Sequence, residues 1–176
     1  MRYIKNIIIF LLILKVSLIA NDFKHIKTFE ASFTQAITNP SGNVVNYTGL
    51  IHIKEPNQIK WQYKNPIEKL VYIKKNNVTI IEPELEQAIV TKLDKEINIL
   101  NLLQNAKKVS NNSYLSNFNN VDYSLKLQNG KLSQISYQDE IENDVIISFS
   151  NVKQNHKIDQ QVFNFFIPLE FDIIKK

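Results

Sequence analysis

The chain has 176 residues with 21 basic and 17 acidic side chains and no cysteine, which predicts one domain stabilised by its core alone. The missing cysteines exclude a disulfide framework, cysteine-bound zinc and thiol catalysis. Three of the basic residues lie in the first 20, so the rest of the chain is nearly neutral, and its scattered lysines form no basic stripe of the kind that binds nucleic acid.

The first twenty residues have the features of a secretory signal peptide. Arg2 and Lys5 form a positive start, Ile7 to Leu14 is an unbroken apolar run, and Ala20 is a plausible last residue before cleavage. The alternative is an uncleaved membrane anchor, but the apolar run is well short of the roughly 20 residues that a membrane span needs. The sequence therefore predicts export of the chain and a single mature domain over residues 21–176.

Beyond this segment, periodicity predicts an antiparallel sheet. A short helix is expected over Asp22 to Thr28, and apolar side chains then alternate with polar ones, as in half-buried strands. Turn residues such as Asn39-Pro40-Ser41-Gly42-Asn43 and Lys74-Lys75-Asn76-Asn77 separate the strands by short links. The first six strands are expected over Phe29 to Ile37, Val44 to Ile53, Gln58 to Tyr63, Leu70 to Ile73, Val78 to Ile81 and Gln87 to Leu93.

The pattern then changes to helical spacing. Asp94 to Asn105 is predicted as a helix that is apolar almost all round, which is unusual for a helix on a soluble surface. The polar, Asn-rich stretch from Lys107 to Asn120 is predicted as a long loop, and Asn129-Gly130 as a hairpin turn. Further strands are expected over Val121 to Leu127, Leu132 to Tyr137, Val145 to Phe149 and Val162 to Ile167. The fold class is α+β with a dominant antiparallel sheet.

No pattern in the sequence indicates catalysis. The three histidines, His25, His52 and His156, are far apart and lack metal-binding spacing. The chain has only three glycines and therefore no glycine-rich phosphate loop, and it has no Gly-x-Ser-x-Gly motif. The sequence therefore predicts a protein that is not an enzyme and that uses no metal and no cofactor.

Several short motifs follow one another along the mature chain. They are Phe29-Glu30-Ala31-Ser32-Phe33-Thr34-Gln35, then Gly49-Leu50, Lys54, Pro56-Asn57, Trp61 and Asn65-Pro66, then Pro83-x-Leu85-Glu86-Gln87-Ala88. In this order and spacing they resemble the LolA family, and the predicted helix from Asp94 to Asn105 lies where that family has a lid helix. The resemblance spans nearly all of the mature chain.

The resemblance implies an incomplete, half-open antiparallel β-barrel of about 10–11 strands with a helical lid over a hydrophobic cavity. It implies a monomeric periplasmic carrier that takes the acyl chains of lipoproteins from an inner-membrane ABC transporter and shuttles them to the outer membrane, with an outer-membrane acceptor as a further partner. Two alternatives remain open at this point. One is a half-barrel binding protein for a free lipid or a regulatory partner, and the other is a secreted enzyme of unknown type.

The expected acyl-chain site combines large apolar residues from strands and from the helix, although each of them also fits ordinary core packing. At the latch that holds the lid, the family has an arginine directly before the proline that corresponds to Pro56, whereas this chain has Glu55. An ionised carboxylate cannot donate a hydrogen bond, so either Lys54 reaches the lid or the lid is held in another way. The predicted lining residues are Phe33, Ile59, Trp61, Tyr63, Ile97, Leu100 and Leu103.

Overall fold

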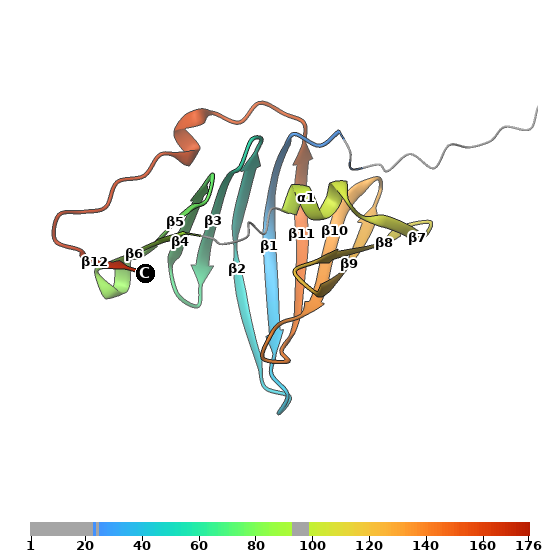
Figure 1. Ribbon diagram of the computed structural model, residues 1–176, viewed down its shortest axis with the longest axis horizontal. Coiled ribbons are helices and arrows are strands. Elements are labelled where there is room, and N and C mark those ends of the chain that lie inside the picture. The colour runs from blue at the N-terminus through green and yellow to red at the C-terminus, as the bar shows by residue number, and fades with distance from the viewer. Residues whose placement is uncertain (1–22, 24, 93–98) are drawn as a thin grey trace, which may run out of the picture.

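The described part of the chain forms one continuous sheet of twelve strands (Figure 1). This computed structural model describes residues 23, 25–92 and 99–176. The strands are β1 (Thr28–Thr38), β2 (Val44–Lys54), β3 (Gln58–Asn65), β4 (Lys69–Lys74), β5 (Asn77–Glu82), β6 (Gln87–Lys92), β7 (Lys107–Ser110), β8 (Ser113–Phe118), β9 (Val121–Gln128), β10 (Lys131–Gln138), β11 (Asp144–Gln154) and β12 (Asp172–Lys175). The helices within these ranges are α1 (Ile99–Gln104) and the short 3-10 helices η1 (Pro83–Leu85) and η2 (Gln160–Phe163).

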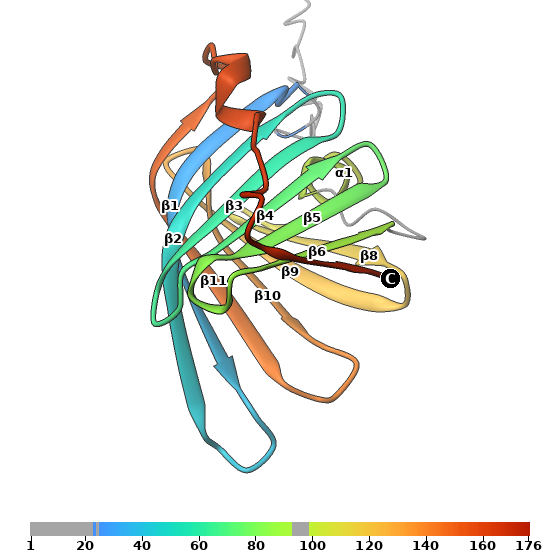
Figure 2. The same cartoon turned by 90° about the vertical axis from the view of Figure 1, so that its left-hand side faces the viewer.

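The strands form two antiparallel meanders, β1 to β6 and β7 to β11, which are joined where β1 pairs with β11. The one parallel pair in this sheet of described residues is that of β12 with β6. The strand order begins with β12 and ends with β7, so the sheet is open rather than a closed barrel. It curls so that α1 lies on its inner side (Figure 2). We call this inner, concave side the trough.

The alternation in β1 shows how the sequence places side chains on the two faces of the sheet. Phe29, Ala31 and Phe33 are buried on the trough side, whereas Thr34 on the opposite side is exposed. The predicted hairpin between β9 and β10 is confirmed as well. Asn129 and Gly130 have φ values of 52° and 73°, and two positive φ values in a two-residue link are the geometry of a type I′ turn.

One hydrophobic core lies between the trough and α1. Four of the six residues of the helix are buried, which explains why its sequence is apolar almost all round. They belong to the same cluster of buried side chains as Phe29, Ile53 and Leu125, which come from three different strands. Burying an aliphatic side chain of this size is worth about 1.5–3 kcal/mol. Packing on the sheet therefore stabilises a helix that is too short to form by its own propensity.

The outer side of the sheet is crossed by residues 155–171, which we call the C-terminal strap (Figure 2). Within the strap Ile158 and Phe163 are buried, and the ring of Phe165 stacks on Tyr72 of β4 with 4.7 Å between ring centroids. The strap leads into β12 at Asp172, whose backbone N–H donates to the carbonyl oxygen of Glu86 at 2.9 Å. It thereby connects β11 to the far edge of the sheet.

Two predictions about strands are wrong. The stretch from Lys107 to Asn120 was predicted as a loop, but it contains β7 and β8. The alternation of apolar and polar residues is weak here, because β7 is exposed throughout and β8 buries only Tyr114 and Ser116. The final strand was predicted over Val162 to Ile167, but this range begins in η2 and continues as an extended stretch. The tight turn arises because Asp159 accepts a hydrogen bond from the backbone N–H of Gln161. With β12 at the C-terminus, the sheet has twelve strands where about 10–11 were expected.

The predicted helices also differ from those in the structure. In the stretch predicted as a helix from Asp22 to Thr28, the described residues form a single turn and then enter β1, because the carbonyl oxygen of Lys27 accepts from the N–H of Glu55 rather than from a helical partner. The helix predicted from Asp94 to Asn105 is present as α1, and residues 93–98 lie outside the described residues. The predicted signal segment also lies outside them. Among the described residues, no helix is long and apolar enough to cross a membrane.

Candidate functional site

Three aromatic rings from β1 and β3 meet in the trough, and we call them the aromatic cluster. Phe33 is in edge-to-face contact with Trp61 and Tyr63, at 4.9 and 5.2 Å between ring centroids. Such pairs contribute about 0.5–1.5 kcal/mol each beyond the area that they bury. Gly49 of β2 makes room for the Phe33 ring, since a Cβ atom at this position would lie 2.8 Å from its Cε1 atom. The structure therefore brings together the three rings that the sequence predicted as lining residues.

The aliphatic members of the predicted lining set lie in the same core. Ile59, Leu100 and Leu103 are at most 3% exposed and belong to the cluster that contains Phe33. Trp61 and Tyr63 are partly buried and pack against this cluster. The seventh predicted residue, Ile97, lies outside the described residues. The six described members therefore lie in, or pack against, one apolar cluster that includes residues of the trough and of α1.

The two residues predicted at the latch make contacts in different directions. Glu55, in the loop between β2 and β3, accepts a hydrogen bond at Oε1 from Nε2 of Gln104, the last residue of α1, at 2.9 Å. Nζ of Lys54 instead donates to the carbonyl oxygen of Ile158 at 3.3 Å and to Oε1 of Gln160 at 3.2 Å. Position 55 thus supplies an acceptor for a donor on the helix, while Lys54 holds the strap.

We expect the Glu55→Lys variant to loosen α1. The substitution replaces the acceptor with a second donor, and a hydrogen bond of this kind is worth about 0.5–1.5 kcal/mol. Amide hydrogen exchange in α1 should therefore speed up by up to roughly tenfold, as measured by exchange mass spectrometry. Glu55→Gln is the matched control, because its carbonyl oxygen still accepts from Gln104. Equal exchange rates in both variants would show that the hydrogen bond between Glu55 and Gln104 does not hold the helix.

A second group of residues extends from Tyr63 farther along the trough, and sequence reasoning singled out none of its other members as site residues. The hydroxyl of Tyr63 donates to Oε1 of Gln35 at 3.2 Å, and the ring of Tyr47 lies 5.7 Å from that of Tyr63. On β9 and β10, the rings of Tyr123 and Tyr137 are 4.9 Å apart. We call these five residues the collar. The alternation in β1 and β2 was the sequence signal that placed Gln35 and Tyr47 on the trough side.

The hydroxyls of Tyr63, Tyr123 and Tyr137 in the collar remain protonated near neutral pH. Burial raises the pKa of Tyr63 to about 12, and the phenols of Tyr137 and Tyr47 add to this shift. Burial also raises the pKa values of Tyr123 and Tyr137. These groups can therefore act as hydrogen-bond donors. Beside them opens a pocket of about 400 Å³, lined by Asn119, Val121, Tyr123, Tyr137, Asp139, Glu140 and Ile141.

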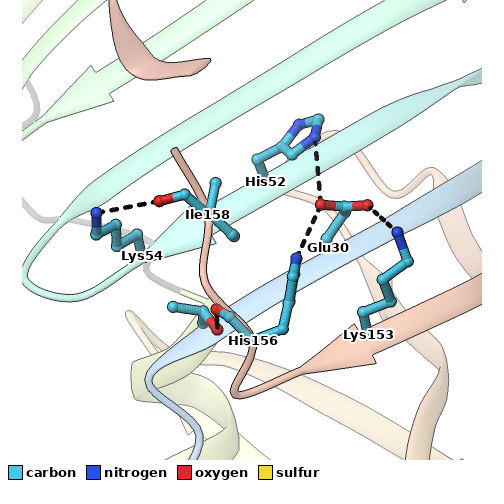
Figure 3. A network of polar contacts seen from close by, with 7 residues as sticks. Glu30, His52, Lys54, Lys153, His156 and Ile158 are labelled. Carbon is cyan, nitrogen blue, oxygen red and sulfur yellow. Dashed lines mark hydrogen bonds and ion pairs between the residues drawn. The ribbon is translucent and has the colours of Figure 1, made fainter. Parts of the chain in front are cut away.

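The outer side of the sheet carries a polar network around Glu30 (Figure 3). Its carboxylate accepts from Nζ of Lys153 at 2.8 Å, contacts Nε2 of His156 in the strap at 3.0 Å, and lies 3.8 Å from Nε2 of His52. The hydrogen bond from Lys153 is the main cause that lowers the pKa of the Glu30 carboxyl. No group of three or more His, Cys, Asp or Glu side chains in the described ranges is arranged to hold a metal ion.

The stability of the protein is expected to decrease as pH is lowered, and His52 is expected to cause part of this decrease. Desolvation by burial lowers the pKa of its imidazole below the ordinary 6.5, and the charges of Lys60, His156 and Lys153 act in the same direction, against that of Glu30. The unfolded chain therefore takes up this proton first as pH falls below 6.5, which favours unfolding. The free energy of unfolding, measured in urea, should fall less between pH 7.5 and 5.5 in His52→Gln than in the unchanged chain. An equal fall in both would contradict the assignment to His52.

Comparison with known proteins agrees with the motifs and with the fold. The family model described as outer membrane lipoprotein carrier protein LolA matches residues 24–122. The outer-membrane lipoprotein carrier protein of Campylobacter jejuni is 37% identical over 148 residues, which cover 84% of this chain and 86% of that relative. Its namesake from Wolinella succinogenes is 31% identical over 155 residues, which cover 88% and 90%.

Solved structures share the fold at low sequence identity. An uncharacterized conserved protein from Thermus thermophilus matches with a TM-score of 0.53 at 6% identity, covering 87% of this chain and 93% of that one. A LolA superfamily protein from Nitrosomonas europaea matches with a TM-score of 0.50 at 8% identity, covering 83% and 94%. The family model and the two relatives show that the chain belongs to the LolA family of outer-membrane lipoprotein carrier proteins.

Proposed function

We propose that this lipoprotein carrier binds the acyl chains of its cargo in the trough, against the aromatic cluster, after α1 moves aside as a lid. The observation that carries the proposal is the contact of α1 with the trough, where Leu100 and Leu103 are almost fully buried. The latch next to this contact includes a hydrogen bond near the surface, between Glu55 and Gln104. A helix held in this way can exchange its apolar contacts for those of an acyl chain.

The energy of binding comes from removing hydrocarbon from water. Each buried methylene is worth about 0.8 kcal/mol, so eight of them give roughly 6 kcal/mol. The empty protein already gains part of this energy from the aliphatic side chains of α1. Cargo must compete with the lid for the same surface, which limits its affinity and allows later release. The proposal needs no catalytic step, metal or cofactor.

We further propose that the chain acts in the periplasm, exported by a signal peptide at residues 1–20, as a single domain over residues 21–176. The apolar run in that segment and the positive residues before it support export. A monomer would receive lipoproteins from an inner-membrane ABC transporter and deliver them to the outer membrane or to an acceptor there. The continuous twelve-stranded sheet of the described residues supports a single domain.

Depletion of the protein in cells tests the carrier function directly. Lipoproteins destined for the outer membrane should accumulate in the inner membrane, as measured by fractionation and immunoblotting, and normal sorting would contradict the proposal. Mass spectrometry of protein purified from the periplasm provides a second test. Co-purified acylated protein supports the carrier, whereas co-purified phospholipid alone would favour a binding protein for free lipid.

A further inference from the structure

The collar and the aromatic cluster differ in chemistry although both lie in the trough. Beside the aromatic cluster, the buried side chains of α1 are isoleucine and leucine. The collar instead carries four phenolic hydroxyls and the amide of Gln35, with Tyr63 belonging to both groups. Among the described residues, only Tyr63 of these four tyrosines uses its hydroxyl in a hydrogen bond within the protein. The collar therefore presents donors inside a largely apolar wall.

The collar lies well away from the latch. The loop that carries Glu55 is at one end of β2, and Tyr47 lies toward the other end, where the β1–β2 hairpin projects past α1 (Figure 1). At about 3.3 Å per residue, the chain from Tyr47 to Glu55 spans roughly 26 Å. One leaflet of a membrane has a hydrocarbon depth of about 15 Å, half of its ~30 Å core. An acyl chain laid along the trough thus fits between the collar and the latch.

The trough is also accessible to solvent next to the collar. Ile141, in the wall of the neighbouring pocket, is 73% exposed, and Val45 on the trough side of β2 is 46% exposed. Tyr123 and Tyr137 line the same pocket. A group held by the collar therefore lies inside the trough but next to an opening, where a polypeptide attached to that group can leave the protein.

We propose that the collar binds the glyceryl head of the acylated cysteine, with its ester and amide groups, while the acyl chains extend from it toward α1. This inference rests on the proposed carrier function and names the part of the cargo that is recognised. Ester and amide carbonyl oxygens accept hydrogen bonds, and phenols and the Nε2 group of Gln35 donate them. A plain hydrocarbon offers these donors no partner, so the collar selects acylated glycerol over other apolar ligands.

The test compares two synthetic lipopeptides with equal chains. One carries diacylglyceryl-cysteine, and the other is its dialkyl ether analogue, which lacks the ester carbonyls. Binding is measured by the fluorescence of Trp61, the only tryptophan of the chain. We expect the ester to bind about tenfold more tightly than the ether, the equivalent of two neutral hydrogen bonds. In Tyr123→Phe/Tyr137→Phe this ratio should fall to near one.

Tyr72→Phe is the matched control, because this tyrosine lies on the outer side of the sheet against Phe165. It should leave the tenfold ratio unchanged. Equal binding of ester and ether by the unchanged protein would overturn the collar proposal and leave the carrier function standing. Binding of neither would overturn the carrier function, and the collar proposal with it. Phosphatidylglycerol with acyl chains of equal length is the last comparison. If it binds as tightly as the ester lipopeptide and its affinity falls as much in the double variant, the collar recognises phospholipid esters and the assignment to acylated cysteine is wrong.

Discussion

Bridging α1 to the loop between β2 and β3 is expected to abolish loading with lipoprotein. In Glu55→Cys/Gln104→Cys, a short reducible bis-maleimide would join the two positions, whose native side chains are in hydrogen-bond contact at 2.9 Å. The helix has six residues and is about 9 Å long, so fixing one end confines Leu100 and Leu103 to the trough. If the tether lowers the open fraction tenfold, apparent affinity for an acylated peptide falls at least about tenfold.

The native chain has no cysteine, so the two introduced thiols are the only reactive ones. Binding of an acylated peptide is measured before and after the linker is cleaved by reduction, and cleavage should restore it. The single variants Glu55→Cys and Gln104→Cys, each capped with a monofunctional maleimide, control for the substitutions and for the added bulk. Loading that persists in the bridged protein would rule out α1 as the gate.

Gly49→Ala is expected to lower the free energy of unfolding by about 3 kcal/mol, the upper part of the usual range for overpacking. A Cβ atom at this position would clash with the carbonyl oxygen of Gln62 and would lie 2.8 Å from Cε1 of Phe33. The first contact is with backbone of the paired strand, so β2 and β3 must separate locally. The second displaces Phe33 from Trp61, so the emission of Trp61 should shift as well as the midpoint of urea unfolding.

Gly42→Ala is the matched control for this substitution. Gly42 lies in the β1–β2 turn with a φ of +83°, and a Cβ atom there would have no neighbour within 4 Å. Its cost is therefore the strain of a positive φ alone, roughly 1–2 kcal/mol, and Trp61 emission should not change. If both variants shift the emission equally, the Phe33–Trp61 contact does not depend on Gly49.

The sequence was sufficient for the sheet wherever apolar and polar residues alternate. The buried face of β1, with Phe29, Ala31 and Phe33, was predicted correctly, as was the hairpin at Asn129-Gly130. It was insufficient for β7 and β8, because strands near an open edge bury few side chains and their sequence looks like that of a loop. The strand pairing of β12 with β6 depends on a long return of the chain, which local periodicity does not encode.

At the candidate site, too, local sequence predicts some contacts, whereas others depend on how distant parts of the chain come together. Phe33 on β1 and Trp61 and Tyr63 on β3 lie on the two strands that flank β2, so alternation alone brings their rings to one face. Tyr137 influences the pKa of Tyr63 although the two strands are far apart in the sheet order, a proximity that arises from the curl. The direction of the hydrogen bond between Gln104 and Glu55 depends on where α1 docks, and local sequence does not encode this position.

Because the strand order is open, the width of the aperture between the two edges of the sheet can change. In a closed barrel, strand number and stagger fix the diameter. Here β12 and β7 end the sheet without meeting, so the aperture can widen by uncurling while each strand keeps its hydrogen-bonded neighbours. Lysines at both margins, Lys107 and Lys108 on β7 and Lys175 on β12, repel one another and discourage edge-to-edge association between copies. An open sheet whose aperture can change in this way can hold lipid anchors of different thickness with the same set of strands.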